Sequence, residues 1–198
     1  MKTSLFRSAL FVIAAATMMA CSSGHQHSHA TAEASTQTIT VEEVNTALKG
    51  WTDALVEIGK VYENGGDYVA LAQQVLDQAY GYTTGKVFFK PTLANGEQTF
   101  RPTNEGALAY FVGGNANFPN DKGFAITPWI AARYDALGAG NEGIQIHGDV
   151  AIFMGNVWVK GKDGNEVMVD KTFAFKKGED GKLRIILHHS SLPYQPVM

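Results

Sequence analysis

The apolar spacing of this sequence changes once, near Pro128, from the period of a helix to that of a strand. Before that point, apolar side chains recur every three or four positions, most clearly along one face of a long amphipathic helix: Val41, Val44, Leu48, Trp51, Leu55, Ile58 and Tyr62. After it, apolar and polar residues alternate in stretches that are separated by Gly, Asn and Asp. Helices followed by an antiparallel meander predict an α+β fold.

Polar residues mark the starts of three helices. The tetrapeptide Thr-Val-Glu-Glu that opens the first helix is a capping box, in which the Thr40 hydroxyl and the Glu43 carboxylate serve unpaired backbone N–H groups. Asp67 is the predicted N-cap of a second, shorter helix. Thr103 is the predicted N-cap of a third helix over residues 104–112.

The strand signals are equally local. Segments 86–92 and 98–101 are joined by the turn signal Asn95-Gly96 and are expected to form a hairpin, with Pro91 confining the first strand to a sheet edge. Longer strands are expected after the change of period, over residues 129–137, 143–147, 149–162, 166–177 and 182–191. We find no internal repeat and no second domain, so residues 39–195 are expected to form one domain.

The N-terminal region has the features of a bacterial export signal. Residues 1–20 combine a basic start with an apolar run that is too short to cross a bilayer, and are expected to be a signal peptide. The sequence Met-Met-Ala-Cys at its end resembles a lipobox, which predicts cleavage before Cys21 and a lipid on its thiol. A plain signal peptide cut nearby is the alternative. Residues 21–38 are polar and are expected to be a disordered tether. The protein is therefore expected to be an exported lipoprotein that faces the periplasm or the cell surface.

The composition limits the possible partners. The chain has 198 residues, of which 45% are apolar, enough for one domain with a core. Cys21 is the only cysteine, which excludes an intramolecular disulfide and a cysteine-rich zinc site. Loss of Lys2 and Arg7 with the signal peptide leaves 14 basic and 19 acidic residues, a net charge of −5. This charge argues against nucleic acid as a partner, and membrane contact is expected only through the lipid anchor.

The last predicted strand, 182–191, runs from an apolar part into the polar cluster His-His-Ser-Ser. Such a strand can place hydrogen-bonding groups at the end of a pocket, or it can simply leave the core for solvent. Alternation does not decide between Ser190 and Ser191, because a flat strand would turn the face of Arg184, His188 and Ser190 outward.

Four short segments together carry a family resemblance: FFKPT at 88–92, QTFRPT at 98–103, AYFVGG at 109–114 and HHSSLP at 188–193. They resemble the bacterial iota-class carbonic anhydrases. That class lies in the nuclear-transport-factor-2-like, or SnoaL-like, superfamily, together with the association domain of calcium/calmodulin-dependent kinase II. The resemblance covers about residues 40–193. It implies a cone in which one strongly bent antiparallel sheet wraps around the long helix and leaves a pocket at its open end.

A carbonic anhydrase needs an apolar niche for CO2, an activated water and a route for the proton. Zinc could activate the water if three protein ligands held it. The histidines after residue 38 are His147, His188 and His189, and the last two point to opposite faces of their strand. No H-E-x-x-H spacing is present, so we favour a site without metal or other cofactor.

The resemblance implies that hydroxyl groups hold the water: those of Thr92, Tyr110 and Ser190. It makes His188, on the strand face of Ser190, the nearest proton acceptor. Aromatic residues could form the CO2 niche or be ordinary core, namely Phe88, Phe111, Trp129 and Phe153. Each hydroxyl also has a purely structural explanation, as a strand end, a core side chain or a partner of a backbone group.

Apolar residues occupy both faces of segment 149–162, with Ile152 and Trp158 on one face and Phe153 and Val157 on the other. An exposed apolar face of that size predicts at least a homodimer. The expected small-molecule partner is CO2 or bicarbonate. Two alternatives stay open: a non-catalytic small-molecule-binding or assembly module of the same fold, and a zinc-dependent version of the enzyme.

Overall fold

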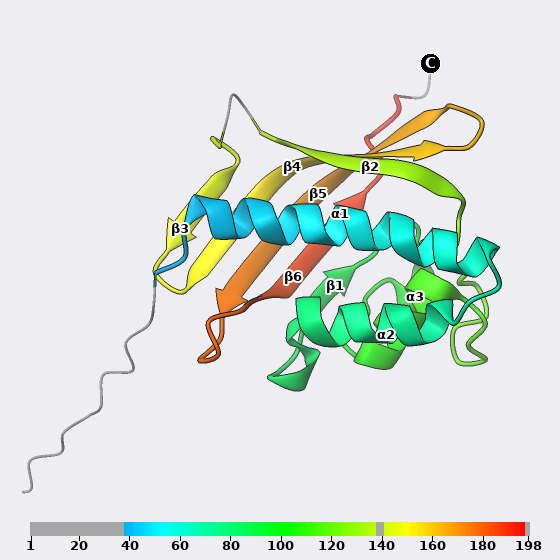
Figure 1. The fold of residues 1–198 in the computed structure, drawn as a ribbon, viewed down its shortest axis with the longest axis horizontal. Helices are drawn as coiled ribbons and strands as arrows, with labels where there is room; N and C mark the ends of the chain where they lie inside the picture. The colour runs from blue at the N-terminus through cyan, green and yellow to red at the C-terminus, as the bar shows by residue number, and fades with distance from the viewer. Residues whose placement is uncertain (1–37, 138–140, 197–198) are drawn as a thin grey trace, which may run out of the picture. The chain divides into compact units, whose positions relative to one another are not determined.

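The computed structural model describes residues 38–137 and 141–196 (Figure 1). Its elements follow the predicted order, helices first and long strands afterwards, which confirms the α+β class. The helices are α1 (Val41–Glu63), α2 (Tyr68–Ala79) and α3 (Asn104–Val112), with short 3₁₀ turns at Gly81–Thr83 and Gly96–Gln98. The strands are β1 (Phe88–Lys90), β2 (Trp129–Ala136), β3 (Ile144–His147), β4 (Val150–Gly161), β5 (Glu166–Lys177) and β6 (Leu183–Ser191).

The predicted caps begin all three helices. Both halves of the capping box form at α1, where the backbone N–H of Glu43 donates to the Thr40 hydroxyl and that of Thr40 donates to the Glu43 carboxylate. Asp67 caps α2 and Thr103 caps α3 in the same manner. No helix in the described ranges is both long and apolar enough to span a membrane.

The sheet has the strand order β1-β6-β5-β4-β2, with β3 pairing to the first part of β4. All pairs are antiparallel except β1–β6, which is parallel. The predicted hairpin over 86–101 is therefore wrong: β1 pairs with β6, and the returning segment makes a single backbone bond, from Arg101 N to Phe89 O. Pro91 and Pro102 flank that contact and cannot donate, so a longer ladder does not form there.

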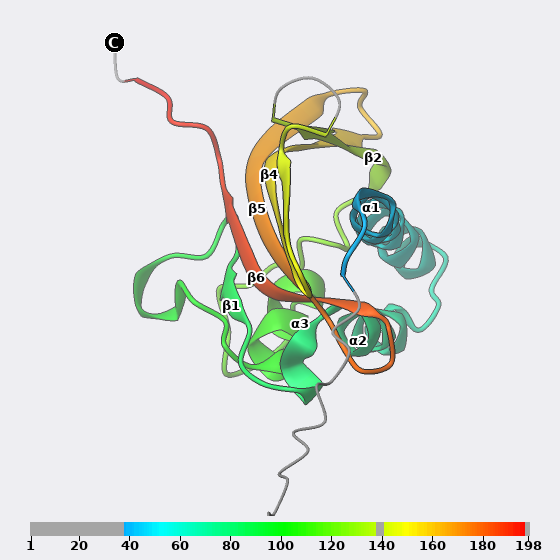
Figure 2. The same cartoon turned by 90° about the vertical axis from the view of Figure 1, so that its left-hand side faces the viewer.

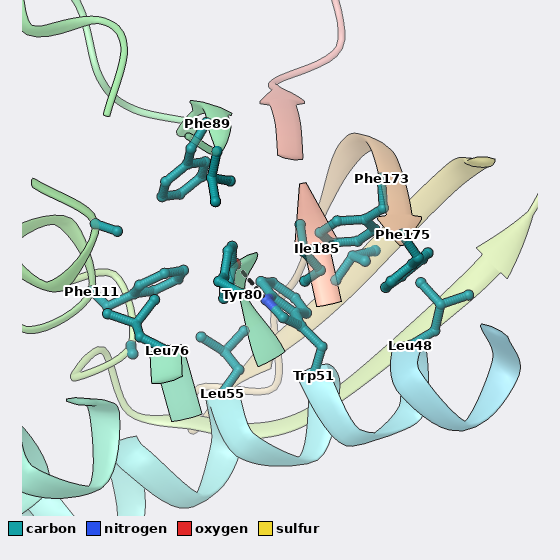
Figure 3. Close-up of a cluster of buried hydrophobic side chains, with 14 of the residues drawn as sticks. Leu48, Trp51, Leu55, Leu76, Tyr80, Phe89, Phe111, Phe173, Phe175 and Ile185 are labelled. Carbon is teal, nitrogen blue, oxygen red and sulfur yellow. Dashed lines mark hydrogen bonds between the residues drawn. The ribbon is translucent and has the colours of Figure 1, made fainter. Parts of the chain in front are cut away.

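The long strands bend around α1, which lies on their concave side (Figure 2). The apolar face of α1 and the inner residues of the strands build a common core with α2 and α3 (Figure 3). Trp51 lies at its centre, with its ring centroid 5.5 Å from that of Phe173 on β5. Within the described ranges, no helix covers the outer face of the sheet, and Ile152 and Met154 on β4 are exposed.

An irregularity in β6 decides which side chains enter the core. Ile185 pairs with Phe175, whereas Leu187 pairs with Ala174, so Ile186 is an extra residue opposite an uninterrupted β5. A bulge of this kind reverses the alternation of the strand beyond it. Ile185 is consequently buried before the bulge, and His188 and Ser190 are buried after it. The strand is therefore not flat, and Ser190, the serine that the resemblance implies, faces the interior rather than Ser191.

Two glycines of α1 provide a test of how closely the chain packs on this helix. A Cβ at Gly59 would lie 2.9 Å from Ala125 O and 3.0 Å from Thr127 O, whereas a Cβ at Gly50 would meet nothing within 4 Å. Gly59→Ala should lower the free energy of unfolding by about 1–3 kcal/mol, because backbone must move. Gly50→Ala should raise it by about 0.5–1 kcal/mol through helix propensity. Urea unfolding of both variants tests this, and equal shifts would contradict the packing.

Candidate functional site

Thr92 and Ser190 form the centre of the candidate site. Thr92 follows β1 and Ser190 lies near the end of β6, and the parallel pairing of these strands brings the two residues together. Their hydroxyl oxygens are 2.6 Å apart and both residues are buried. Lys90, two residues before Thr92, donates from Nζ to the backbone carbonyl of Ser190 over 2.8 Å. The ammonium group of Lys90 is thus bound at the end of β6 that carries the Ser190 hydroxyl.

Tyr110 brings a third hydroxyl from α3. Its side chain stacks on Phe124 and meets Phe89 edge-on, with centroid distances of 5.7 and 5.8 Å. Its Oη is buried and has no hydrogen-bond partner among the described residues. Burial raises the pKa of Tyr110 to about 12, against an opposing effect of the nearby Thr92 hydroxyl. The phenol therefore keeps its proton at neutral pH and is available as a donor.

The hydroxyl groups of this cluster have donors and acceptors left over for a ligand. One hydroxyl of the Thr92–Ser190 pair donates to the other, which leaves one hydroxyl proton and several lone pairs unused. Tyr110 adds a further donor. The cluster can thus accept a hydrogen bond from a water molecule and donate a hydrogen bond to an anionic oxygen.

His188 lies two residues before Ser190 on the same inner face. Both ring nitrogens are engaged: Nδ1 lies 2.9 Å from Tyr80 Oη, and Nε2 lies 2.9 Å from Lys171 Nζ. The ring also stacks on Phe89 at 4.4 Å. Burial, followed by the charge of Lys171, lowers the pKa of His188 well below its ordinary value. Its role as proton acceptor stays a prediction, and this environment disfavours a protonated ring.

Lys171 on β5 was not anticipated as part of the site. It is only 3% exposed, pairs directly with Ser190 across the sheet, and points into the core between Val169 and Phe173. Its Nζ lies 4.7 Å from the centre of the Trp51 ring. The signal was present in the sequence, because Lys171 falls on the apolar side of an otherwise regular alternation.

Three of the four predicted aromatic residues lie inside the fold, each in a different place. Phe111 is buried beside Phe89, at a centroid distance of 5.7 Å, and so lies next to the hydroxyl cluster. Trp129 packs on Phe124 and donates its indole N–H to the Phe124 carbonyl, one shell further out. Phe153 lies on β4 against Phe173 and Tyr134, in the core of the cone.

Phe88 requires a correction. It is 72% exposed on the outer face of β1, so it does not line the interior near Thr92. Successive residues of a strand face opposite ways, and β1 turns Phe89 inward instead. Nothing in the sequence FFK distinguishes the two phenylalanines, because that choice is made by the pairing of β1 with β6.

The remaining candidates lie away from the hydroxyl cluster or outside the described residues. His147 on β3 and His189 on β6 are exposed. Within the ranges that the structure covers, no three His, Cys, Asp or Glu side chains gather so as to hold a metal ion. Cys21 and the predicted signal peptide and tether precede the described part of the chain.

The sequence matches the family model of metal-independent carbonic anhydrases over residues 42–192. A metal-independent carbonic anhydrase of Nostoc sp. strain PCC 7120 is 50% identical over 159 residues, which are 79% of this chain and 75% of that protein. The chain belongs to the metal-independent carbonic anhydrase family. The family resemblance carried by the four short segments is thereby confirmed.

Two solved structures are similar to this chain, and the first of them supports the family assignment. One is a crystal structure of the iota-carbonic anhydrase from a cyanobacterium, complexed with bicarbonate, whose sequence is 49% identical to that of this chain. The alignment covers 80% of this chain and 95% of that one, with a TM-score of 0.76. A putative calcium/calmodulin-dependent protein kinase II association domain from Xanthomonas campestris aligns at 20% identity over 81% of this chain and 98% of its own, with a TM-score of 0.47.

Proposed function

We propose that this protein hydrates CO2 reversibly to bicarbonate at the cluster of Thr92, Tyr110 and Ser190. The observation that carries the assignment is the contact between the Thr92 and Ser190 hydroxyls beside the buried Tyr110 hydroxyl, which has no hydrogen-bond partner in the described part of the chain. A relative that is 50% identical over 159 aligned residues is named a metal-independent carbonic anhydrase, and a similar crystal structure is a complex with bicarbonate.

Each hydroxyl has a distinct role in the proposed reaction. Thr92 and Ser190 accept hydrogen bonds from the reacting water and so aim its lone pair at the carbon of CO2. As the O–C bond forms, one C=O electron pair moves onto a CO2 oxygen. The Tyr110 hydroxyl donates to that oxygen, where negative charge develops. The raised pKa of Tyr110 keeps this donor protonated throughout the neutral range.

The surroundings fit a small apolar substrate that becomes an anion. Phe89, Phe111 and Phe124 form the walls near Tyr110 and would exclude bulk water from CO2. Lys90 donates to the Ser190 carbonyl at the same strand end. The positive charge of Lys90 at that point favours the bicarbonate product.

Removal of single hydroxyls tests the proposed site. Thr92→Val and Ser190→Ala should each lower stability by only ~1 kcal/mol, because one hydrogen bond is lost. Tyr110→Phe should lower it by less, because the Tyr110 hydroxyl has no hydrogen-bond partner among the described residues. Each should slow CO2 hydration by about 10²–10³-fold, because Tyr110→Phe removes a preorganised donor at the developing charge and the other two variants each remove a group that positions the water. The three losses should not multiply in a triple variant, because the groups act together on one reacting pair of water and CO2. Stopped-flow hydration assays and thermal melts measure both effects.

The control for these variants is Tyr62→Phe, which removes an exposed phenol on α1 and should change neither rate nor melting temperature. Parent-like rates in all three site variants would place the reaction elsewhere. Loss of parent activity on exhaustive chelation, with recovery on adding Zn²⁺, would favour the zinc-dependent alternative. If the parent protein binds bicarbonate but does not hydrate CO2, the alternative of a non-catalytic binding module of the same fold would be favoured.

We further propose that the protein is held at a bacterial membrane by a lipid on Cys21 and faces the periplasm or the cell surface. The lipobox-like residues before Cys21 and the polar stretch after it support this location. Cys21→Ser should abolish lipid attachment and shift the protein out of the membrane fraction, whereas Ser23→Ala should not. Cell fractionation with mass spectrometry of the N-terminus tests this. A wholly soluble parent protein starting at another residue would contradict it.

A homodimer through the outer face of the sheet is the proposed assembly. Ile152 and Met154 are exposed on β4, and Trp158 and Met168 are half-buried and paired beside them. A second copy would cover this apolar surface. Met154→Glu should weaken the dimer, because the charge would be buried in the contact. Val69→Glu, on exposed α2, is the matched control. Light scattering that finds only monomer at micromolar parent protein would refute the assembly.

A further inference from the structure

In the buried hydrogen-bonded chain that ends at Lys171, only the first link has a fixed donor. The Trp51 indole N–H donates to Tyr80 Oη over 2.9 Å, and tryptophan has no acceptor (Figure 3). The next links are Tyr80 Oη to His188 Nδ1 and His188 Nε2 to Lys171 Nζ, each 2.9 Å. All four side chains are more than nine-tenths buried, so they determine the positions of one another's protons.

Two arrangements of protons fit these contacts. With Lys171 as a neutral amine, Tyr80 donates to Nδ1 of His188, and Nε2–H donates to the amine. Every proton between these residues then has an acceptor. With Lys171 as an ammonium, it donates to Nε2, the ring proton moves to Nδ1, and the Tyr80 hydroxyl proton loses its acceptor. The ring stays neutral in both arrangements, and Lys171 is the member of the chain whose charge changes.

The surroundings of Lys171 offer no negative charge to hold it as an ammonium. None of the ion pairs among the described residues includes it. The titratable groups that approach it are Lys90 from β1, His188 from β6 and, through His188, Tyr80 from the end of α2. Helix α1 presents the ring of Trp51, and β4 presents Gly155, which has no side chain. The exposed His189 faces the other side of the sheet.

Lys171 is also placed beside the proposed reaction. It is the direct cross-strand partner of Ser190, on the same inner face of the sheet, so its side chain and the Ser190 hydroxyl enter the core as neighbours. His188, which Lys171 contacts, is the next inward residue of β6. A base on Lys171 thus shares the inner face of the sheet with the Ser190 hydroxyl that would hold the water.

We propose that Lys171 holds the proton that leaves the water when CO2 is hydrated, an inference that rests on the proposed carbonic anhydrase reaction. The water oxygen bonds to carbon, a C=O pair moves onto oxygen, and a water O–H bond breaks. The released proton binds the lone pair of the Lys171 amine, which gives bicarbonate and an ammonium group. The ammonium then loses its proton to buffer, and the reverse reaction draws its proton from the same group.

Electrostatics support this assignment of roles. Burial, and to a smaller degree the charge of Lys90, lowers the pKa of Lys171 to about 7. Amine and ammonium forms are then both populated at neutral pH, as a reversible proton store requires. Burial lowers the pKa of His188 well below its usual value and raises that of Tyr80 well above its own, so neither exchanges a proton in that range.

The pH profile of CO2 hydration tests the proposal. The parent rate should rise with pH through about 7, because hydration needs the amine form. Lys171→Met keeps an unbranched apolar side chain, and it should lose about 10²–10⁴-fold in rate together with this pH step. Lys176→Met, which removes an exposed lysine of the same strand, should keep both. A Lys171→Met protein that retains the pH step would overturn the inference, even with a reduced rate.

A second measurement does not depend on the variant folding. The Lys171 Nζ and Cε signals of the labelled parent protein should titrate near pH 7 by NMR. A lysine that stays charged beyond about pH 9 would overturn the inference, while leaving the hydroxyl site intact. A parent protein without CO2 hydration would overturn the proposed function itself and remove the reaction that Lys171 is inferred to serve.

Discussion

The structure depends on satisfying polar groups that its core has buried. Trp51, Tyr80, His188 and Lys171 come from four different elements and bond to one another in sequence. A buried polar atom without a partner costs about 1–3 kcal/mol, so none of the four can move alone without loss. This chain fixes α1 and the end of α2 against β5 and β6. It therefore also fixes the strand end on which the candidate site is built.

The aromatic packing adds the second constraint. Phe89 touches Tyr110, Phe111, Tyr80 and His188, and so joins the hydrogen-bonded chain to the hydroxyl cluster. The fold thereby separates two tasks within a small volume. In the proposed reaction, one group of residues would hold an oxygen at the Thr92–Ser190 pair, and the other would hold the buried amine of Lys171, the cross-strand neighbour of Ser190. Neither arrangement requires a carboxylate, although acidic residues outnumber basic ones in this chain.

Local signals predicted most of the fold, whereas long-range pairing decided the rest. Thr40, Asp67 and Thr103 begin their helices because a cap acts within a few residues. Alternation located the long strands for the same reason. The prediction of a hairpin after β1 was wrong because β1 pairs instead with β6, about 100 residues away in the chain. The same pairing chose Phe89 over Phe88, and Lys171 was overlooked because a lone lysine on an apolar face was not treated as a core residue.

The extra residue Ile186 shows that the sequence motif and the site are not equivalent. If the alternation at the start of β6 continued unbroken, His188 and Ser190 of the motif HHSS would face solvent. Only the one extra residue turns them inward. A homologue could keep every letter of the motif and lose the site through a deletion of one residue upstream. The extra residue also reverses the orientation of every side chain that follows it in β6. Comparison of relatives should therefore count residues between Ile185 and His188 before it transfers any role by motif.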